Sequence, residues 1–146
     1  VSCAAHVGRI LERVGVEPCP AFSDGHTSLR PLIPFTFEHG GMKIDYSALV
    51  DSGADFCIFH SFVGDILGID IENGKEARFG GVGGTGMRAY FHTITTRFGN
   101  HPYELYCGFS SDIPADGYGI LGQIGFFDHF KITFDHGAEE LEIMPR

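Results

Sequence analysis

One short stretch of the sequence carries residues that could perform acid–base chemistry. Asp51, Ser52 and Gly53 directly follow an apolar run at residues 48–50. Three apolar residues in a row are typical of a strand buried on both faces, and Ser-Gly favours a turn. A carboxylate at the end of such a strand is held rigidly, with a hydroxyl and backbone amides near enough to set its proton affinity. An ordinary turn has the same composition, so this motif alone leaves both interpretations open.

Two further stretches favour chemistry over an ordinary turn. Residues 79–86 read Phe-Gly-Gly-Val-Gly-Gly-Thr-Gly, which predicts the tip of a hairpin. Residues 119–122 read Gly-Ile-Leu-Gly, an apolar pair between two glycines. On composition alone the first stretch is equally a flexible hairpin tip, while a phosphate-binding loop is disfavoured because it holds no Gly-Lys-Ser/Thr. The acid turn, the glycine-rich tip and the apolar-apolar-glycine turn, in this order within residues 31–145, resemble the retropepsin-like aspartic proteases.

The resemblance implies a role for each residue that matches the motifs of that family. Asp51 matches the catalytic acid, Ser52 the hydroxyl that braces its turn, and Gly53 a carbonyl that faces the substrate. The implied substrate-binding residues are those after the acid turn and those of the hairpin tip, or flap: Ala54, Asp55, Gly80, Gly81, Val82 and Gly83. Glycine suits such a tip, because a missing Cβ permits positive φ and close approach to an extended peptide. The apolar turn at residues 120–122 would pack behind the acid loop as support.

The sequence departs from the family pattern at Gln123. Many relatives carry an arginine after the apolar-apolar-glycine turn, where it pairs with the acid at the Asp55 position. Here Gln123 follows Gly122. A neutral hydrogen bond to Asp55 would replace a charge-assisted one, so we expect the site to be braced less firmly.

The chemistry that the resemblance implies needs two carboxylates, one to take a proton from water and one to protonate the carbonyl oxygen. The chain carries a single Asp-Ser-Gly. We therefore expect a two-fold homodimer in which Asp51 of each copy contributes one carboxylate, with peptide or protein substrates and neither cofactor nor metal. The alternatives are a catalytically weak or inactive retropepsin-fold dimerisation or peptide-binding module, and an unrelated β-barrel binding protein with a chance Asp-Ser-Gly.

Composition limits the class of protein. The 146 residues suffice for one domain, and 43% hydrophobic content with 14 Phe can fill a sizeable core. The net charge of −9, without a basic run, disfavours nucleic-acid binding. The four cysteines match no zinc pattern. No apolar segment approaches the roughly 20 residues of a membrane helix, and no signal peptide is visible. A cytoplasmic protein is therefore the default expectation. Because residue 1 is Val, the sequence is also compatible with an upstream anchor or signal that has been removed.

The predicted elements form an all-β domain. Short strands with glycine turns recur every 8–12 residues, at 32–37, 42–50, 56–60, 75–79, 87–98, 103–109, 120–121, 131–135 and 141–144. A short helix is expected at 61–67, and the periodic apolar residues of 123–130 predict another near the C-terminus. We assign residues 31–146 to a retropepsin-like acid-protease β-barrel with one short helix near its C-terminus. Residues 1–30 are a separate arm or linker containing an amphipathic helix at 7–14.

Overall fold

The structure, a computed structural model, describes residues 30–80 and 86–146. Residues 1–29 of the predicted arm, with their expected helix, and residues 81–85 of the glycine-rich tip lie outside the described part. The described part contains the following elements: β1 (Leu32–His39), β2 (Met42–Val50), β3 (Cys57–His60), α1 (Ser61–Ile66), the 3₁₀ helix η1 (Ile71–Asn73), β4 (Lys75–Phe79), β5 (Met87–Phe98), β6 (His101–Ser110), β7 (Gly119–Leu121), β8 (Phe130–Asp135) and β9 (Glu140–Pro145).

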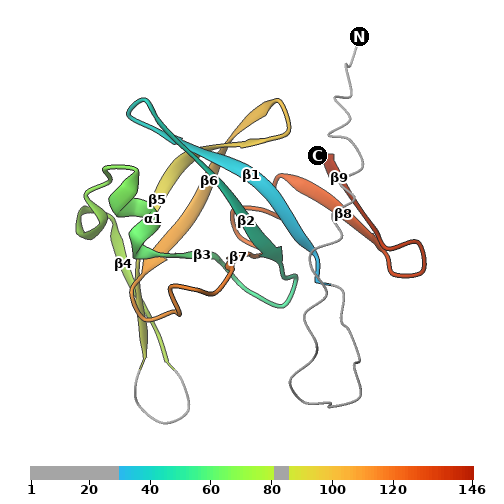
Figure 1. Cartoon of the computed structure of the whole chain (residues 1–146). Helices are drawn as coiled ribbons and strands as arrows, with labels where there is room; N and C mark the ends of the chain where they lie inside the picture. The colour runs from blue at the N-terminus through green and yellow to red at the C-terminus, as the bar shows by residue number, and fades with distance from the viewer. Residues whose placement is uncertain (1–29, 81–85) are drawn as a thin grey trace.

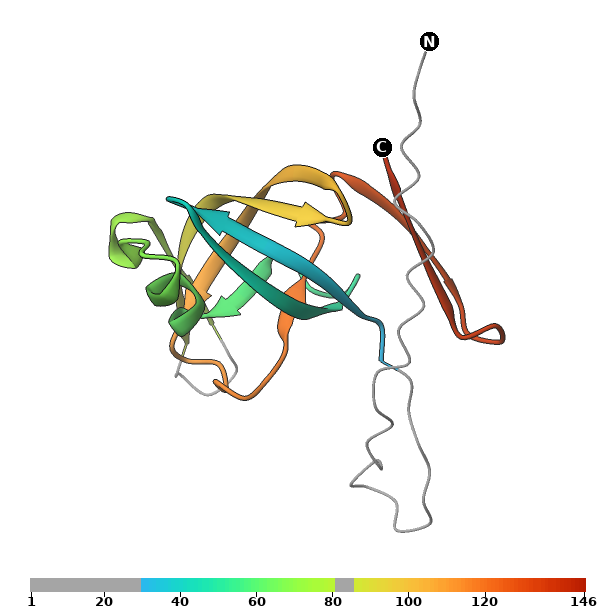
Figure 2. The same cartoon turned by 45° about the horizontal axis from the view of Figure 1, so that its top comes forward.

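Seven strands form one sheet that closes into a barrel (Figure 1). Their order is β1-β2-β7-β3-β6-β5-β4, and a further pairing of β1 with β5 closes the first six into a barrel, with β4 continuing from β5. Strands β8 and β9 form a separate two-stranded hairpin, which extends from one side of the barrel in Figures 1 and 2. The predicted all-β barrel is therefore confirmed.

The first hairpin shows how the sequence specifies its strands. In β1 the side chains of Ile33, Phe35 and Phe37 are buried and alternate with more exposed residues, as expected for a strand with one face on a core. The turn to β2 uses Gly40 and Gly41, whose φ angles of 54° and 82° are in the left-handed region that glycine adopts without a Cβ clash. This turn fixes the register of the hairpin.

The core of the barrel is rich in phenylalanine. Phe98 is fully buried and stacks on Phe35 with ring centroids 4.9 Å apart. Its ring also lies 5.4 Å from Phe126 and 5.3 Å from Phe130. Aromatic pairs at these separations contribute beyond their buried area. These contacts join the barrel to the segment that leads into the β8–β9 hairpin.

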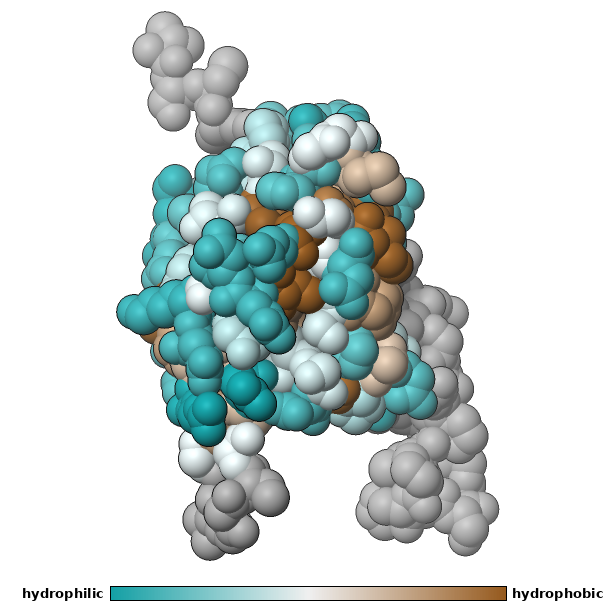
Figure 3. Space-filling model, turned by 90° about the vertical axis from the view of Figure 1, so that its left-hand side faces the viewer, coloured by the Kyte–Doolittle hydropathy of each residue, from teal (hydrophilic) through white to brown (hydrophobic). Residues whose placement is uncertain are grey.

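The one α-helix of the described residues is α1, not a helix near the C-terminus. The expectation of a helix at 61–67 is confirmed, whereas residues 123–129 form turns. Gly125, with φ of 105°, interrupts any helix there, and Ile124 pairs with Phe56 in an isolated bridge. The apolar residues of this segment therefore have helical spacing although the backbone forms a series of turns. α1 lies against β3 and β6, and η1 lies against β5, on the face that Figure 3 shows.

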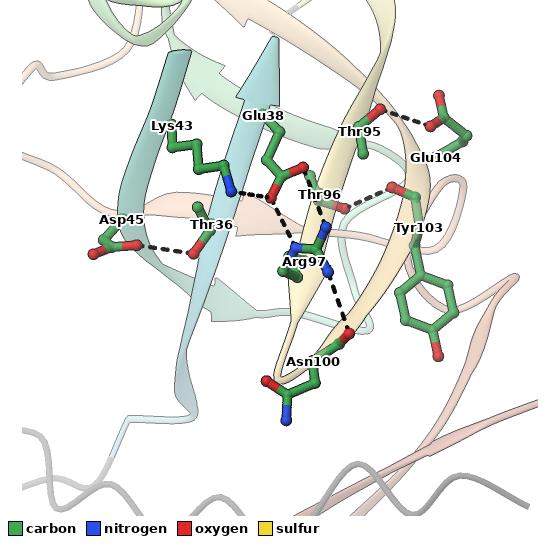
Figure 4. A network of polar contacts seen from close by, with 10 residues as sticks. All are labelled: Thr36, Glu38, Lys43, Asp45, Thr95, Thr96, Arg97, Asn100, Tyr103 and Glu104. Carbon is green, nitrogen blue, oxygen red and sulfur yellow. Dashed lines mark hydrogen bonds and ion pairs between the residues drawn. The ribbon is translucent and has the colours of Figure 1, made fainter. Parts of the chain in front are cut away.

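The β1–β5 seam that closes the barrel is short. It pairs residues Thr36, Phe37 and Glu38 with residues 95–97. On its outer side Arg97 Nε donates to Glu38 Oε1 at 2.7 Å, and Lys43 Nζ lies 3.5 Å from the same oxygen (Figure 4). The pKa of Glu38 is lowered, chiefly by its hydrogen bond from Arg97. An ion pair therefore spans the seam.

No helix among residues 30–80 and 86–146 is long and apolar enough to cross a membrane.

Candidate active site

Asp51 lies where two parallel strands end side by side. β2 pairs in parallel with β7, with Val50 opposite Leu121. The backbone N–H of Asp51 donates to the carbonyl oxygen of Leu121 at 3.0 Å. The chain therefore leaves the barrel at Asp51 from a fixed position, and the acid loop starts directly beside the apolar-apolar-glycine turn.

Backbone donors within the acid loop orient its carboxylate. The N–H of Gly53 donates to Asp51 Oδ1 at 2.9 Å, and the N–H of Ala54 donates to the Asp51 carbonyl oxygen at 3.2 Å. Asp51 is half-buried, while Ser52 and Gly53 are exposed. A carboxylate that accepts one backbone N–H and still reaches solvent is oriented and accessible, which is the arrangement that acid–base work on a bound water requires.

The turn after β7 supports the acid loop from behind. The N–H of Gln123 donates to the carbonyl oxygen of Ala54 at 2.9 Å, and the N–H of Ile124 donates to that of Asp55 at 2.9 Å. Gly122 fits this contact because it lacks a side chain: a Cβ there would lie 2.7 Å from the Ala54 carbonyl oxygen and closer still to that of Phe56. The two loops thus touch through backbone atoms, as the resemblance implies for residues 120–122.

The side chain of Gln123 binds a different partner from the one expected. Its Nε2 donates to the carbonyl oxygen of Ser52 at 2.8 Å, and not to Asp55, which is exposed. The amide therefore braces the turn immediately after Asp51, whereas the side chain of Asp55 stays available at the surface. Sequence reasoning identified Gln123 correctly as the neutral residue at this position but assigned it the wrong acceptor.

Cys57 is a supporting residue that the sequence did not reveal. The N–H of Gly122 donates to Cys57 Sγ at 3.3 Å, so the thiol contacts the turn that holds the acid loop. Burial raises the pKa of Cys57 to about 12, and the thiol therefore stays neutral. Cys57 and Cys107 are both free and buried. The contact with Gly122 gives no signal in the sequence, because the two residues are far apart in it.

The predicted flap is described only at its base. β4 and β5 pair up to Phe79 and Met87, and Gly80 follows as an exposed residue. Gly81, Val82 and Gly83 lie outside the described residues. Below the hairpin, Phe56 lies 5.5 Å from Phe79 between ring centroids. Because Phe56 follows Asp55 in the chain, an aromatic contact connects the acid loop to the base of the hairpin.

Among residues 30–80 and 86–146, no three His, Cys, Asp or Glu side chains are grouped so that they could hold a metal ion.

Comparison with solved structures identifies the fold of the chain. No protein-family model and no curated protein matches the sequence. A retropepsin-like aspartic protease from Rickettsia conorii is 19% identical with a TM-score of 0.56, over 84% of this chain and 92% of that one. The retroviral protease-like domain of Ddi1 from Leishmania major is 16% identical with a TM-score of 0.55, over 80% of this chain and 94% of that one. At such identities the likeness establishes the retropepsin-like fold.

Proposed function

We propose that the chain is an aspartic endopeptidase that hydrolyses peptide bonds in extended polypeptides, with Asp51 as its catalytic residue. The observation that carries the proposal is the position of Asp51: it follows β2 in a retropepsin-like barrel, and its carboxylate accepts a hydrogen bond from Gly53. Solved proteins of this fold include aspartic proteases. Fold alone does not imply function, so the oriented acid loop is the necessary second support.

The proposed enzyme is a two-fold homodimer, because each chain supplies one Asp-Ser-Gly. Two carboxylates about 3 Å apart share one proton. The ionised carboxylate of one Asp51 removes a proton from water, and the water oxygen bonds to the carbonyl carbon of the substrate. The protonated carboxylate of the other Asp51 gives its proton to the carbonyl oxygen. The carboxyl group that took the water proton then gives it to the amide nitrogen, a hydroxyl of the tetrahedral intermediate gives its proton to the other carboxylate, and the carbon–nitrogen bond breaks. The pair again holds one shared proton.

Exposed apolar residues near the acid loop support self-association. Ile124, whose N–H binds Asp55, is 43% exposed, and Tyr118, just before β7, is 41% exposed. Apolar side chains beside a site that is incomplete in one chain are suited to a contact with a second copy. The resemblance also implies that Leu141 and Ile143 lie in the strand that retropepsins use at their dimer sheet. Both side chains are buried in the core cluster of a single chain, so they do not add to this support.

The proposed substrate is an extended peptide. Such a peptide would lie between the acid loop and the flap, and would hydrogen-bond through its backbone to the loop residues Ala54 and Asp55 and to the flap residues Gly80, Gly81, Val82 and Gly83. The pockets for its side chains would be apolar, because Phe56 and Phe79 lie between the acid loop and the base of the flap. We expect bulky apolar residues on either side of the cleaved bond, which digestion of a mixed peptide library would show; a strict preference for basic residues would contradict this.

Replacing Asp51 with Asn tests the proposal directly. Cleavage of a mixed peptide library at about pH 5–6, where a carboxylate pair holds one proton, should fall by about 10²–10⁴-fold, the usual contribution of acid–base catalysis. Asp116→Asn removes an exposed carboxylate outside the acid loop and should leave the rate unchanged. Equal rates for the wild type and Asp51→Asn would refute the proposal. A wild type that is dimeric, folded and inactive would favour the non-catalytic binding module instead.

A mixing experiment tests whether two chains build one site. If both carboxylates are required, a mixture of equal amounts of wild type and Asp51→Asn, after exchange of subunits, retains about one quarter of the activity of the same total amount of wild type. If each chain works alone, about one half remains. The mixture is incubated until its activity no longer changes with time, so that slow exchange of subunits is not mistaken for independence. Sedimentation of the same samples gives the fraction of dimer.

A further inference from the structure

The peptide unit between Ser52 and Gly53 has a hydrogen bond at each of its two ends. Its carbonyl oxygen, that of Ser52, accepts the 2.8 Å hydrogen bond from Gln123 Nε2. Its N–H, that of Gly53, donates to Asp51 Oδ1 at 2.9 Å. Because a peptide unit is planar, the directions of its C=O and its N–H are linked. The side chain of Gln123 therefore acts on the donor that orients the Asp51 carboxylate.

This peptide unit is the central one of a β-turn. The N–H of Ala54 donates to the carbonyl oxygen of Asp51 at 3.2 Å, which closes the turn. Neither of its two central residues, Ser52 and Gly53, has a positive φ. A hydrogen-bonded turn of this kind without positive φ is of type I. In this form the Gly53 N–H reaches Asp51 Oδ1.

The residues of the turn do not by themselves select this form. Type II differs from type I mainly by rotation of the central peptide unit to the opposite direction, and it requires a positive φ at the third residue of the turn. That residue is Gly53, and glycine adopts positive φ without a Cβ clash. Ser52 and Gly53 are exposed, so the rotation needs little rearrangement of the surroundings. It would turn the Gly53 N–H away from Asp51 and remove this donor from the carboxylate.

Gln123 opposes this rotation from outside the turn. Rotation would carry the Ser52 carbonyl oxygen away from Gln123 Nε2 and break their hydrogen bond. The backbone of Gln123 is itself held, because its N–H donates to the carbonyl oxygen of Ala54 at 2.9 Å. One hydrogen bond shifts such an equilibrium about 2- to 12-fold. A hydrogen bond at the carbonyl oxygen also polarises the peptide unit, which makes its N–H a stronger donor.

We infer that Gln123 is a positioning residue, which orients the Asp51 carboxylate through the one peptide unit between Ser52 and Gly53. An amide does this without placing a positive charge next to a carboxylate pair that has to keep one proton. The catalytic consequence rests on the proposed function. The orientation itself does not, because both hydrogen bonds lie within one chain and form without substrate.

The test observes the Gly53 N–H directly by NMR. Ser-Gly occurs once in the sequence, at residues 52–53. Cell-free synthesis with serine labelled at its carbonyl carbon and glycine labelled at its nitrogen therefore gives a single amide signal in a carbonyl-selected spectrum. In the wild type this signal should move between about pH 7 and pH 3, where carboxylates take up protons. Gln123→Met has a side chain of similar length without a donor, and it should lose most of this movement.

Kinetics of the same proteins connect the orientation to catalysis. For one peptide cleaved from the library, Gln123→Met should lower kcat about 2- to 12-fold, the effect of one hydrogen bond, with KM within about 2-fold. Lys131→Met places the same side chain at an exposed position of β8 and should change neither quantity. A loss confined to kcat distinguishes positioning from a loosened fold, which circular dichroism of both variants checks.

Two results would overturn the inference. One is a Gly53 signal that moves equally with pH in the wild type and in Gln123→Met, because Gln123 would then not orient the donor. The other is loss of this movement with kcat unchanged, because the orientation would then not serve catalysis. An inactive wild type would refute the proposed function, and the NMR comparison alone would then decide the inference: loss of the movement supports it and equal movement overturns it.

Discussion

Replacing Gly122 with alanine is expected to destabilise the protein by separating the acid loop from the turn that supports it. The new Cβ would lie 2.7 Å from the carbonyl oxygen of Ala54 and nearer still to that of Phe56. Both neighbours are backbone atoms, so neither can rotate away as a side chain would. One of the two segments has to move, and the acid loop is the less embedded of them.

The size of the effect follows from the contacts that such a movement breaks. Crowding in a packed site costs about 1–3 kcal/mol. The hydrogen bonds from Gln123 and Ile124 to the acid loop, both 2.9 Å long, span the same contact, and each contributes about 1 kcal/mol. Because a shift that relieves the clash lengthens these bonds, the two costs overlap. We expect the free energy of unfolding to fall by about 2–4 kcal/mol.

Urea unfolding followed by circular dichroism measures this change, with peptide cleavage assayed on the same samples. Gly137→Ala is the matched control, because its Cβ would have only Asp135 Oδ1 nearby, at 3.6 Å. That variant should stay within about 0.5 kcal/mol of the wild type. Should Gly122→Ala also stay within that limit, the reasoning that the backbone contact supports the acid loop would be wrong.

Two further predictions follow from shifted pKa values. Because burial raises the pKa of Cys57 to about 12, its thiol is protonated at pH 8. Iodoacetamide should therefore label Cys57 slowly in the native protein and rapidly in urea, as measured by mass spectrometry. Equal labelling rates in the two conditions would contradict the burial of this thiol. Arg97 lowers the pKa of Glu38 below 4.5, so this ion pair stabilises the fold above about pH 4.5 and its contribution is lost as pH falls through the lowered value. Arg97→Ala should therefore lower the urea midpoint at pH 7 slightly and reduce the difference between pH 7 and pH 3; an unchanged difference would show that Glu38 is not stabilised by this pair.

Local patterns in the sequence account for most of the strands. In β1 the alternation of Ile33, Phe35 and Phe37 with Pro34, Thr36 and Glu38 predicts the strand and its buried face. The two glycines that follow His39 predict the turn. The acid loop could be located from its own residues together with the glycine-containing stretches at 79–86 and 119–122, because the three stretches in this order resemble the retropepsin-like proteases. These features are local, and sequence reasoning handles local features well.

Contacts between distant segments could not be predicted in this way. The apolar residues of 123–130 have helical spacing, yet Ile124 pairs with Phe56 and Gly125 adopts a positive φ, so tertiary contacts determine the turns. The acceptor of Gln123 depends on which carbonyl lies within reach after the barrel closes. In each case the deciding neighbour is remote in the sequence.

The short seam between β1 and β5 has a consequence for folding. The β1–β2 and β5–β6 hairpins join neighbouring strands and can form early, whereas Glu38 and Arg97 of the seam are 59 residues apart. Closing so long a loop has an entropic cost that only three residue pairs and one ion pair offset there, so the seam forms after both hairpins. Until it forms, β1 and β5 each present an open edge that can pair with the same edge of another chain. The interval before the barrel closes is therefore when this protein is most exposed to strand exchange and aggregation, and a low protein concentration during refolding reduces both.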